Sequence, residues 1–154
     1  MSIRPGVRLG IDVGTVRIGI ARSDSGAILA TPLGTVSRAE GAINEILHML
    51  SDIGAVEIIV GLPLALSGSR TASTQDAFDF AEQLAAVTEI PVRLVDERLS
   101  TVSAQQALHS RGKNTRNSRP IIDQVAATII LQHALDVERS SGNPPGDVIA
   151  HDKG

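Results

Sequence analysis

The sequence predicts a single α/β domain built on a mixed β-sheet with helices on both faces. Its first part holds three short apolar runs separated by turn residues, which favours antiparallel strands. The later apolar runs alternate with helical patterns, which favours parallel strands joined by right-handed crossovers. A chain of 154 residues with 42% hydrophobic residues can bury one full core. We expect residues 1–140 to form this domain and the polar residues 141–154 to form a flexible tail.

The antiparallel part of the sheet is predicted at the start of the chain. Apolar runs at Val7–Val13 and Arg17–Ser23 flank the short turn GTV and are typical of a β-hairpin. The turn residues DSG then lead into a third strand over Ala27–Val36. We therefore expect three consecutive antiparallel strands.

Helices and parallel strands alternate in the middle of the chain. Apolar residues at helical spacing predict a helix over Ser37–Ile53, with Gly54 as its C-cap. The run VEIIV at Val56–Val60 lacks alternation, which suits a central strand covered on both faces. A loop with Pro63 and Gly68 follows this strand.

A second helix is expected over Ser73–Val87, where Ser73 and Asp76 resemble a capping pair. Phe78 belongs to the apolar stripe that this helix turns toward the sheet. The next strand is expected over Pro91–Val95.

Two further helices are predicted in the last third of the chain. The first begins near Ser100 and stops at Gly112. A basic loop follows, and Pro120 suits the first turn of a last helix that runs to about Arg139.

Composition excludes several classes of protein. The chain has no cysteine, so thiolate metal sites, disulfides and cysteine nucleophiles are excluded. Its aromatic residues are Phe78 and Phe80, too few for a base-stacking platform. The N-terminus lacks the apolar run of a signal peptide, and no stretch reaches the ~18–20 apolar residues of a membrane-spanning helix. We expect a cytoplasmic protein with no membrane partner.

Positive charge is concentrated in one segment, although the net charge of the chain is −3. No acidic residue occurs between Arg98 and Ile122. The ordinary explanation is a solvated loop, but basic residues without balancing acids also suit binding to phosphates. The basic residues of this segment are Arg98, Arg111, Lys113, Arg116 and Arg119.

Acidic residues stand at the ends of two predicted strands. Asp12 interrupts the first strand between Gly10 and Gly14, two residues that allow a backbone or a ligand to approach closely. Asp96 and Glu97 follow the strand at Pro91–Val95, at the edge where open α/β sheets bind ligands. Each acid also has an ordinary explanation as a solvated strand end or a cap.

Asp123 lies in the first turn of the last predicted helix. An acid there is favourable because the N-terminus of a helix is positively polarised. Asp123 also shares a helix face with Ala126, Ala127 and Ile130, so we expect it to face packed protein and to need a cation partner.

Three carboxylates from separate elements match the chemistry of a divalent cation. Asp12, Asp123 and one of the neighbouring acids Asp96 and Glu97 offer the oxygen ligands that Mg²⁺ and Mn²⁺ prefer. One or two such ions can activate a water molecule and stabilise the leaving oxygen of a phosphodiester.

Four motifs follow one another along residues 7–138. They are GIDVGTVRIGIA at Gly10–Ala21, VGLP at Val60–Pro63, DERLST at Asp96–Thr101 and IDQVAATIILQ at Ile122–Gln132. In order and spacing they resemble the YqgF/RuvX family of small bacterial proteins, described as Holliday-junction resolvases or nucleases that process pre-16S ribosomal RNA.

The resemblance implies an RNase H-like fold in which Asp12, Glu97 and Asp123 are catalytic and bind Mg²⁺ or Mn²⁺. Asp96 is then a supporting or capping residue, and Arg98 a structural or phosphate-facing partner of the acids. Family members often carry Asn where this chain has Ala65, so a substrate contact from that position is in doubt. Symmetric cleavage of a junction needs two active sites, so the resolvase interpretation predicts a homodimer.

Three hypotheses for function remain open at this point. The first is a metal-dependent endonuclease on structured nucleic acid, with the basic segment, Ser69 and Arg70 as phosphate-binding residues. DNA junctions and ribosomal RNA precursors both fit it. The second is a nucleic-acid-binding regulatory module without catalysis, which the Ala65 departure favours. The third is nucleotide binding of the actin/Hsp70 type, suggested by GIDVGT, but such proteins need two of these domains and this chain supplies one.

Overall fold

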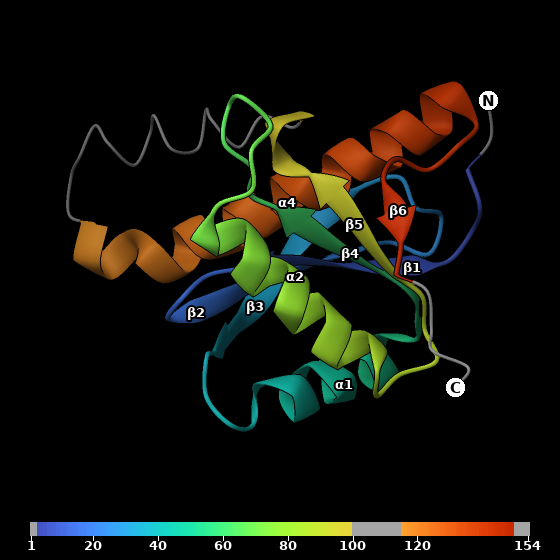
Figure 1. Cartoon of the computed structure of the whole chain (residues 1–154). Helices are drawn as coiled ribbons and strands as arrows, with labels where there is room; N and C mark the ends of the chain where they lie inside the picture. The colour runs from blue at the N-terminus through green and yellow to red at the C-terminus, as the bar shows by residue number, and fades with distance from the viewer. Residues whose placement is uncertain (1–2, 100–114, 150–154) are drawn as a thin grey trace.

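The computed structural model describes residues 3–99 and 115–149. Within them, strands form a single sheet in the order β3-β2-β1-β4-β5-β6, with helices on both of its faces (Figure 1). The helix expected between Ser100 and Gly112 lies outside the described residues. No helix of the described ranges is long and apolar enough to cross a membrane.

The sheet is mixed, as the sequence predicts. β2 pairs in antiparallel fashion with both β1 and β3, whereas β4 is parallel to β1 and to β5. The first two strands have the predicted bounds. The first five strands are β1 (Val7–Val13), β2 (Arg17–Ser23), β3 (Ala30–Ser37), β4 (Ala55–Leu62) and β5 (Val92–Asp96).

The third strand begins later than predicted because a turn precedes it. The Asp24 carboxylate accepts hydrogen bonds from the backbone N–H groups of Ile28 and Leu29, at 2.7 and 3.0 Å. These bonds hold residues that a strand would otherwise use for pairing, so β3 starts at Ala30 and not at Ala27.

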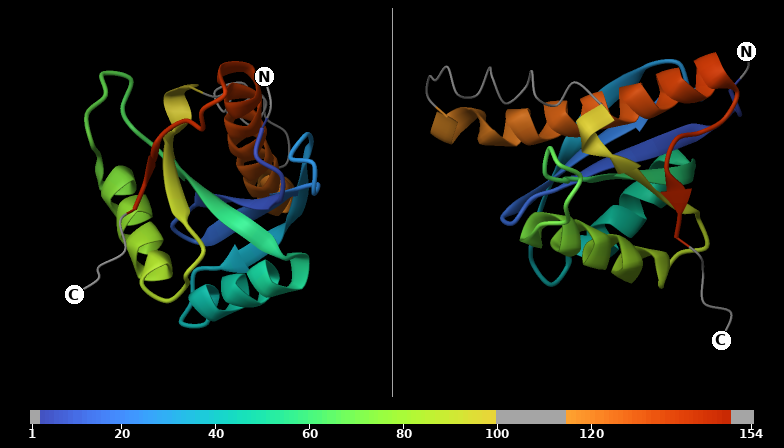
Figure 2. Two further views of the ribbon diagram at one scale, coloured as in Figure 1. Left: turned by 90° about the vertical axis from the view of Figure 1, so that its right-hand side faces the viewer. Right: turned by 45° about the horizontal axis from the view of Figure 1, so that its top comes forward.

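α1 (Ala42–Ile53) and α2 (Ala72–Ala85) cover one face of the sheet (Figure 2). Gly54 ends α1 in the left-handed conformation, with φ 64°, and this confirms the predicted C-cap. The predicted cap of α2 is wrong, because Thr71 and Thr74 form the capping box. Phe80, and not the expected Phe78, is the buried aromatic residue of α2. The two residues are about 200° apart around the helix, so they lie on opposite sides of it.

α4 (Thr115–Ser141) lies on the opposite face (Figure 2). Its apolar residues, among them Ala127 and Leu131, pack against small side chains of the sheet such as Ala21. The helix starts well before Pro120, which was expected in its first turn. Because the fixed φ of proline is helical, proline is compatible with a longer helix that loses one hydrogen bond.

The C-terminal segment returns to the sheet. β6 (Asp147–Val148) pairs in antiparallel fashion with β5, and the Ile149 N–H donates to the carbonyl of Val92 at 2.8 Å. The prediction of a free tail from residue 141 is therefore wrong for this part of the chain. The physical reason is that β5 presents an edge whose backbone groups need partners, and a polar segment can supply them.

Candidate active site

The residues of the site project from the sheet face that α4 covers. Side chains alternate along β1, so that Leu9 and Ile11 enter the core under α1 and α2 while Gly10 and Asp12 face α4. A Cβ atom on Gly10 would lie 2.7 Å from the Cβ of Leu131 in α4, which places the two elements in direct contact. Asp12 therefore lies at the carboxyl end of a central strand, beneath this helix.

Glycines on the two neighbouring strands allow α4 and the acidic residues to come close. Gly19 of β2 is the register partner of Asp12, and a Cβ on it would overlap the backbone oxygen of Asp123. A Cβ on Gly61 of β4 would lie 2.8 Å from the Oε2 atom of Glu97. The absence of a side chain at each position thus opens the space that the carboxylates occupy.

Asp12 and Glu97 form a carboxyl pair. Burial, the charge of Asp12 and a hydrogen bond with it raise the pKa of Glu97 to about 8. Burial and the charge of Asp123 raise the pKa of Asp12 to about 6, while the hydrogen bond with Glu97 opposes this rise. Two adjacent carboxyl groups that share a proton in this way behave as one unit, and near neutral pH the unit carries a single negative charge.

Asp123 lies beside this pair but has a cation of its own. Its Oδ2 atom accepts a hydrogen bond from Nε of Arg17 at 3.0 Å, and the two side chains are 27% and 28% exposed. The expectation that Asp123 needs a cation partner is confirmed, with Arg17 in that role.

Sequence reasoning missed Arg17 as a site residue. A signal for it was present, because Arg17 alternates in β2 with Ile18 and Ile20, which enter the core under α1 and α2. It therefore shares the face of Gly19, the face that carries Asp12 and α4.

The site fits a divalent cation in part. Asp12 and Glu97 place two carboxyl groups side by side in a poorly solvated position, where a cation can replace the shared proton. Asp123 is turned toward Arg17. Accordingly, the described residues contain no group of three or more His, Cys, Asp or Glu side chains already arranged around a metal position. The structure brings together two of the three predicted ligands and places the third next to them.

Arg98 is held by its neighbours. Its Nη2 atom lies 2.6 Å from Oδ2 of Asp96, and its backbone N–H also donates to Asp96 at 2.9 Å. This arginine lowers the pKa of Asp96, and its Nη1 atom donates to the carbonyl of Leu66 at 3.2 Å. Arg98 therefore ties the end of β5 to the loop after β4. In that loop the hydroxyl groups of Ser67 and Ser69 lie 2.6 Å apart.

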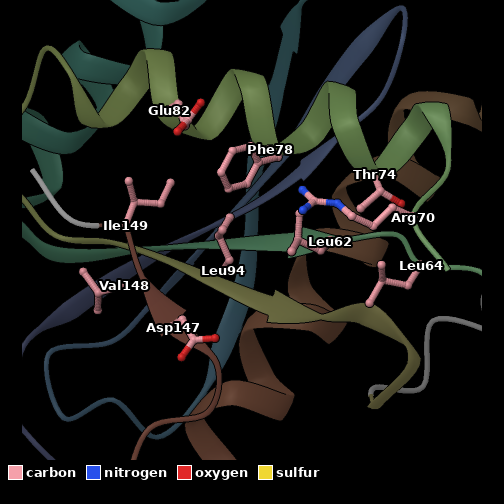
Figure 3. A pocket seen from close by; sticks show the side chains of 10 residues that line it. All are labelled: Leu62, Leu64, Arg70, Thr74, Phe78, Glu82, Leu94, Asp147, Val148 and Ile149. Atoms are coloured by element: carbon pink, nitrogen blue, oxygen red, sulfur yellow. The ribbon is translucent and has the colours of Figure 1, made fainter. Parts of the chain in front are cut away.

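Arg70 is not placed beside the carboxylates. Its guanidinium lies over the ring of Phe78, 5.1 Å from the ring centre. Both residues line a cavity of about 580 Å³ between α2, β5 and β6, which Leu62 and Leu94 also line (Figure 3). Leu94 and Val92 belong to the core under α1 and α2, so this cavity opens on the other face of the sheet from Asp12.

The predicted basic segment is described only in part. Arg111 and Lys113 lie outside the described residues, and the structure places Arg116 and Arg119 in the first turns of α4 without describing their side chains. The helix that carries these two arginines also carries Asp123.

Comparison with solved structures defines the class of this fold. RuvC of T. thermophilus, solved in complex with Holliday junction substrate, superposes with a TM-score of 0.51 at 18% identity, over 92% of this chain and 99% of that chain. A second structure of T. thermophilus RuvC gives the same TM-score and the same coverage. The chain therefore has the RNase H-like fold of RuvC, which confirms the expected fold class.

Sequence comparison then identifies the family. The family model described as RuvX, Holliday junction resolvase, matches residues 6–137. A protein of Leifsonia xyli subsp. xyli named "Putative pre-16S rRNA nuclease" is 63% identical over 94% of each chain. A protein of Clavibacter michiganensis with the same name is 55% identical over 98% of this chain and 96% of its own. The chain belongs to the RuvX family and is a hydrolase of the nuclease class.

Proposed function

We propose that this nuclease is a divalent-metal-dependent endonuclease that cuts phosphodiester bonds in structured nucleic acid. The observation that carries the proposal is the Asp12–Glu97 pair, two half-buried carboxyl groups that interact at the carboxyl edge of the sheet. Two like charges in such a place are unfavourable without a cation, and their position is typical of a functional site.

In the proposed mechanism Asp12 and Glu97 would hold the metal ion, with Asp123 as a third ligand once it leaves Arg17. The ion, Mg²⁺ or Mn²⁺, would supply an activated water and stabilise the leaving oxygen. The carboxyl pair would release its shared proton to solvent on holding the ion, so metal affinity should rise with pH. Arg98, with Asp96 and the loop at Leu66, forms a cationic border of the site that can face a phosphate.

The proposed substrate is precursor 16S ribosomal RNA, cut at its 5′ end, with Holliday junctions as the second candidate. The names of the relatives from Leifsonia and Clavibacter support the first substrate, and the family description supports the second. A chain with two phenylalanines and no Trp or Tyr suits recognition of phosphates and shape. Ribosomal RNA processing implies a cytoplasmic location, and resolution of a junction implies a homodimer.

The test is a cleavage assay on a 16S precursor leader and on four-way DNA junctions, with Mg²⁺, Mn²⁺ or EDTA. We expect cleavage that needs the metal and is lost in Asp12→Asn. Asp52→Asn makes the same chemical change at an exposed position of α1 and is the matched control. Unchanged cleavage in Asp12→Asn rejects the site, and preference for one substrate decides between RNA and DNA.

A nucleic-acid-binding module without catalysis is the second candidate function. The pairing of Asp123 with Arg17 favours it, because this contact leaves two carboxylates for a metal ion. Equal binding of nucleic acid in Mg²⁺ and EDTA, with no cleavage of either substrate, would support this alternative.

A further inference from the structure

We propose that Arg17 is a positioning residue that holds the Asp123 carboxylate until a divalent cation takes it, and that the freed guanidinium then binds a phosphate of the nucleic acid. This inference rests on the proposed function. It assigns to one residue two successive partners of the same charge, first a carboxylate of the protein and then a phosphate of the substrate.

The contact between Arg17 and Asp123 is suited to exchange. It is a single hydrogen bond from Nε, the only one the guanidinium makes within the described residues, and both side chains are more than a quarter exposed. Arg38 is different, because it donates two hydrogen bonds to Asp76, at 2.9 and 3.0 Å, and a third to the carbonyl of Gly14. A partly exposed pair with one hydrogen bond contributes little to stability, so a divalent cation can displace it.

The backbone fixes Arg17 at the edge of the carboxyl pair. Its carbonyl accepts the N–H of Gly14 at 3.0 Å, which closes the tight turn between β1 and β2. Arg17 stands two residues before Gly19, the register partner of Asp12. Because this hydrogen bond holds the backbone of Arg17 and the side chain is long, the guanidinium can change partners while the Cα atom stays beside the site.

Asp123 is close enough to serve either partner. Its charge acts directly on Asp12, and its Oδ2 atom contacts Arg17. Asp123 would be available as a third oxygen ligand for a cation held by Asp12 and Glu97. With Asp123 engaged there, the planar donors of Arg17 would be left beside the acids and could bind a phosphate of the substrate.

The first experiment measures metal affinity in the absence of nucleic acid. Binding of Mn²⁺ is followed by the electron paramagnetic resonance signal of the free ion, in the wild type, Arg17→Gln and Arg22→Gln. Arg22 lies on the same strand and donates to the carbonyl of Ser23 at 3.3 Å, so its replacement removes an equal charge away from the acids. We expect Arg17→Gln to bind Mn²⁺ about three- to tenfold more tightly, because a competing cation is gone, and Arg22→Gln to match the wild type. Unchanged or weaker binding by Arg17→Gln overturns the inference.

The second experiment measures affinity for an uncut four-way junction by fluorescence anisotropy, in Ca²⁺ and in EDTA. We expect Arg17→Gln to weaken binding about three- to tenfold in Ca²⁺ and much less in EDTA, where Arg17 is still held by Asp123. Arg17→Lys keeps the positive charge but lacks the planar set of guanidinium donors. Its affinity for the junction in Ca²⁺ should lie between those of the wild type and Arg17→Gln. Equal weakening in both conditions overturns the second half of the inference.

Two controls separate failure of the inference from other failures. Thermal unfolding of each variant shows that it is folded. Mn²⁺ binding that is lost in Asp12→Asn is assigned to the candidate active site. If the wild type has no Mn²⁺ site that is sensitive to Asp12→Asn, the proposed function fails and this inference with it. If that site exists and Arg17→Gln leaves its affinity unchanged, only the inference fails.

Discussion

The sheet face under α4 has two ends, and the pKa values of acidic residues at these ends are shifted in opposite directions. At one end Glu138 lies 2.7 Å from Arg4, and hydrogen bonds from this arginine lower its pKa to about 2. At the other end burial and the neighbouring Asp12 raise the pKa of Glu97 to about 8. The same helix and the same strands carry both ends, so the difference comes from the partners that each acid has.

The first end is a buried ion network. Arg8 is 1% exposed, and its guanidinium lies 3.7 Å from Glu57 and 3.5 Å from Glu138. Glu57 also pairs with Arg93 at 3.1 Å and with Arg4 at 3.1 Å. Acids and arginines alternate, so that each carboxylate faces at least two cations. The network joins the N-terminal segment, β1, β4, β5 and the C-terminal part of α4.

The second end holds acids next to acids. The groups whose charges raise the pKa of Glu97 are Asp12 and Asp96, and the charge that raises the pKa of Asp12 is that of Asp123. Such an arrangement costs folding free energy, and the surrounding sheet must hold it in place. Arg8 and Asp12 lie in the same short strand, β1. One strand thus contributes to a stabilising network and to a strained site.

The largest expected effect is on catalysis in Asp12→Asn. In the proposed mechanism Asp12 holds the metal ion that would activate the water, so we expect cleavage to fall about 10³-fold. The free energy of unfolding should not fall in the same variant, because the substitution removes the poorly solvated negative charge that the pair carries near neutral pH. Cleavage rates and urea unfolding curves, both measured on the same preparation, check the two expectations.

The opposite pattern is expected in Glu138→Gln. Replacing one acid of the buried network leaves Arg8 and Arg4 with less negative charge, and we expect a loss of about 3 kcal/mol in the free energy of unfolding. The metal-dependent kcat should stay near the wild-type value at temperatures where the variant is folded. A variant that keeps its stability but loses cleavage would reverse the roles assigned to the two ends.

The sequence predicts the local features of both ends better than their contacts. Alternation along Val7–Val13 and Arg17–Ser23 predicts the hairpin bounds, and the placement of Gly54 predicts the end of α1, because each depends on neighbouring residues alone. The pair of Arg17 with Asp123 spans 106 positions of the chain, and that of Arg4 with Glu138 spans 134. No local pattern contains such information.

The same limit explains the errors at the C-terminus and in α2. Pairing of β6 with β5 depends on an open strand edge and on the contact of Arg93 with the carbonyl of Pro145, at 3.4 Å. The cap at Thr71 depends on the exact start of the helix, which propensity places within a few residues. For β6 the deciding partner is the backbone of a strand about 50 residues away, and backbone partners leave no mark in composition.

A smaller effect is expected in Gly19→Ala. The new Cβ atom would overlap the backbone oxygen of Asp123, so α4 must shift and carry Asp123 away from Asp12. We expect a loss of about 2 kcal/mol in unfolding free energy and weaker Mn²⁺ binding. Gly41→Ala is the matched control, because nothing lies within 4 Å of a Cβ at that position. Equal effects of the two substitutions would show that α4 does not rest on Gly19 as the structure indicates.

The smallest expected effect is the pH dependence of stability in the metal-free protein. The acids at the two ends of the α4 face change the free energy of unfolding in separate pH ranges. Glu97 and Asp12 have raised pKa values of about 8 and 6, so the folded state holds protons that the unfolded state has lost. Their contribution is full below about pH 4 and is lost as the pH rises through those values, so we expect stability to fall between pH 5 and pH 8. Glu138, with a lowered pKa of about 2, contributes above its ordinary pKa and loses that contribution as the pH falls toward 2.

Urea unfolding in EDTA at pH 5, 6.5 and 8 measures the first of these ranges. In Asp12→Asn the fall should be smaller, because Glu97 then lacks the charge of Asp12 that helps to raise its pKa. Added Mg²⁺ should remove the fall at pH 8, where the carboxyl pair is deprotonated and ready to bind. In Glu138→Gln the fall between pH 5 and 8 should persist, because that residue belongs to the network at the other end. Two results would contradict this prediction: a wild-type stability that rises between pH 5 and 8, or a fall that Asp12→Asn leaves unchanged. Either result would mean that the carboxyl pair does not share a proton. The two ends of the α4 face would then not differ in the way the pKa values indicate.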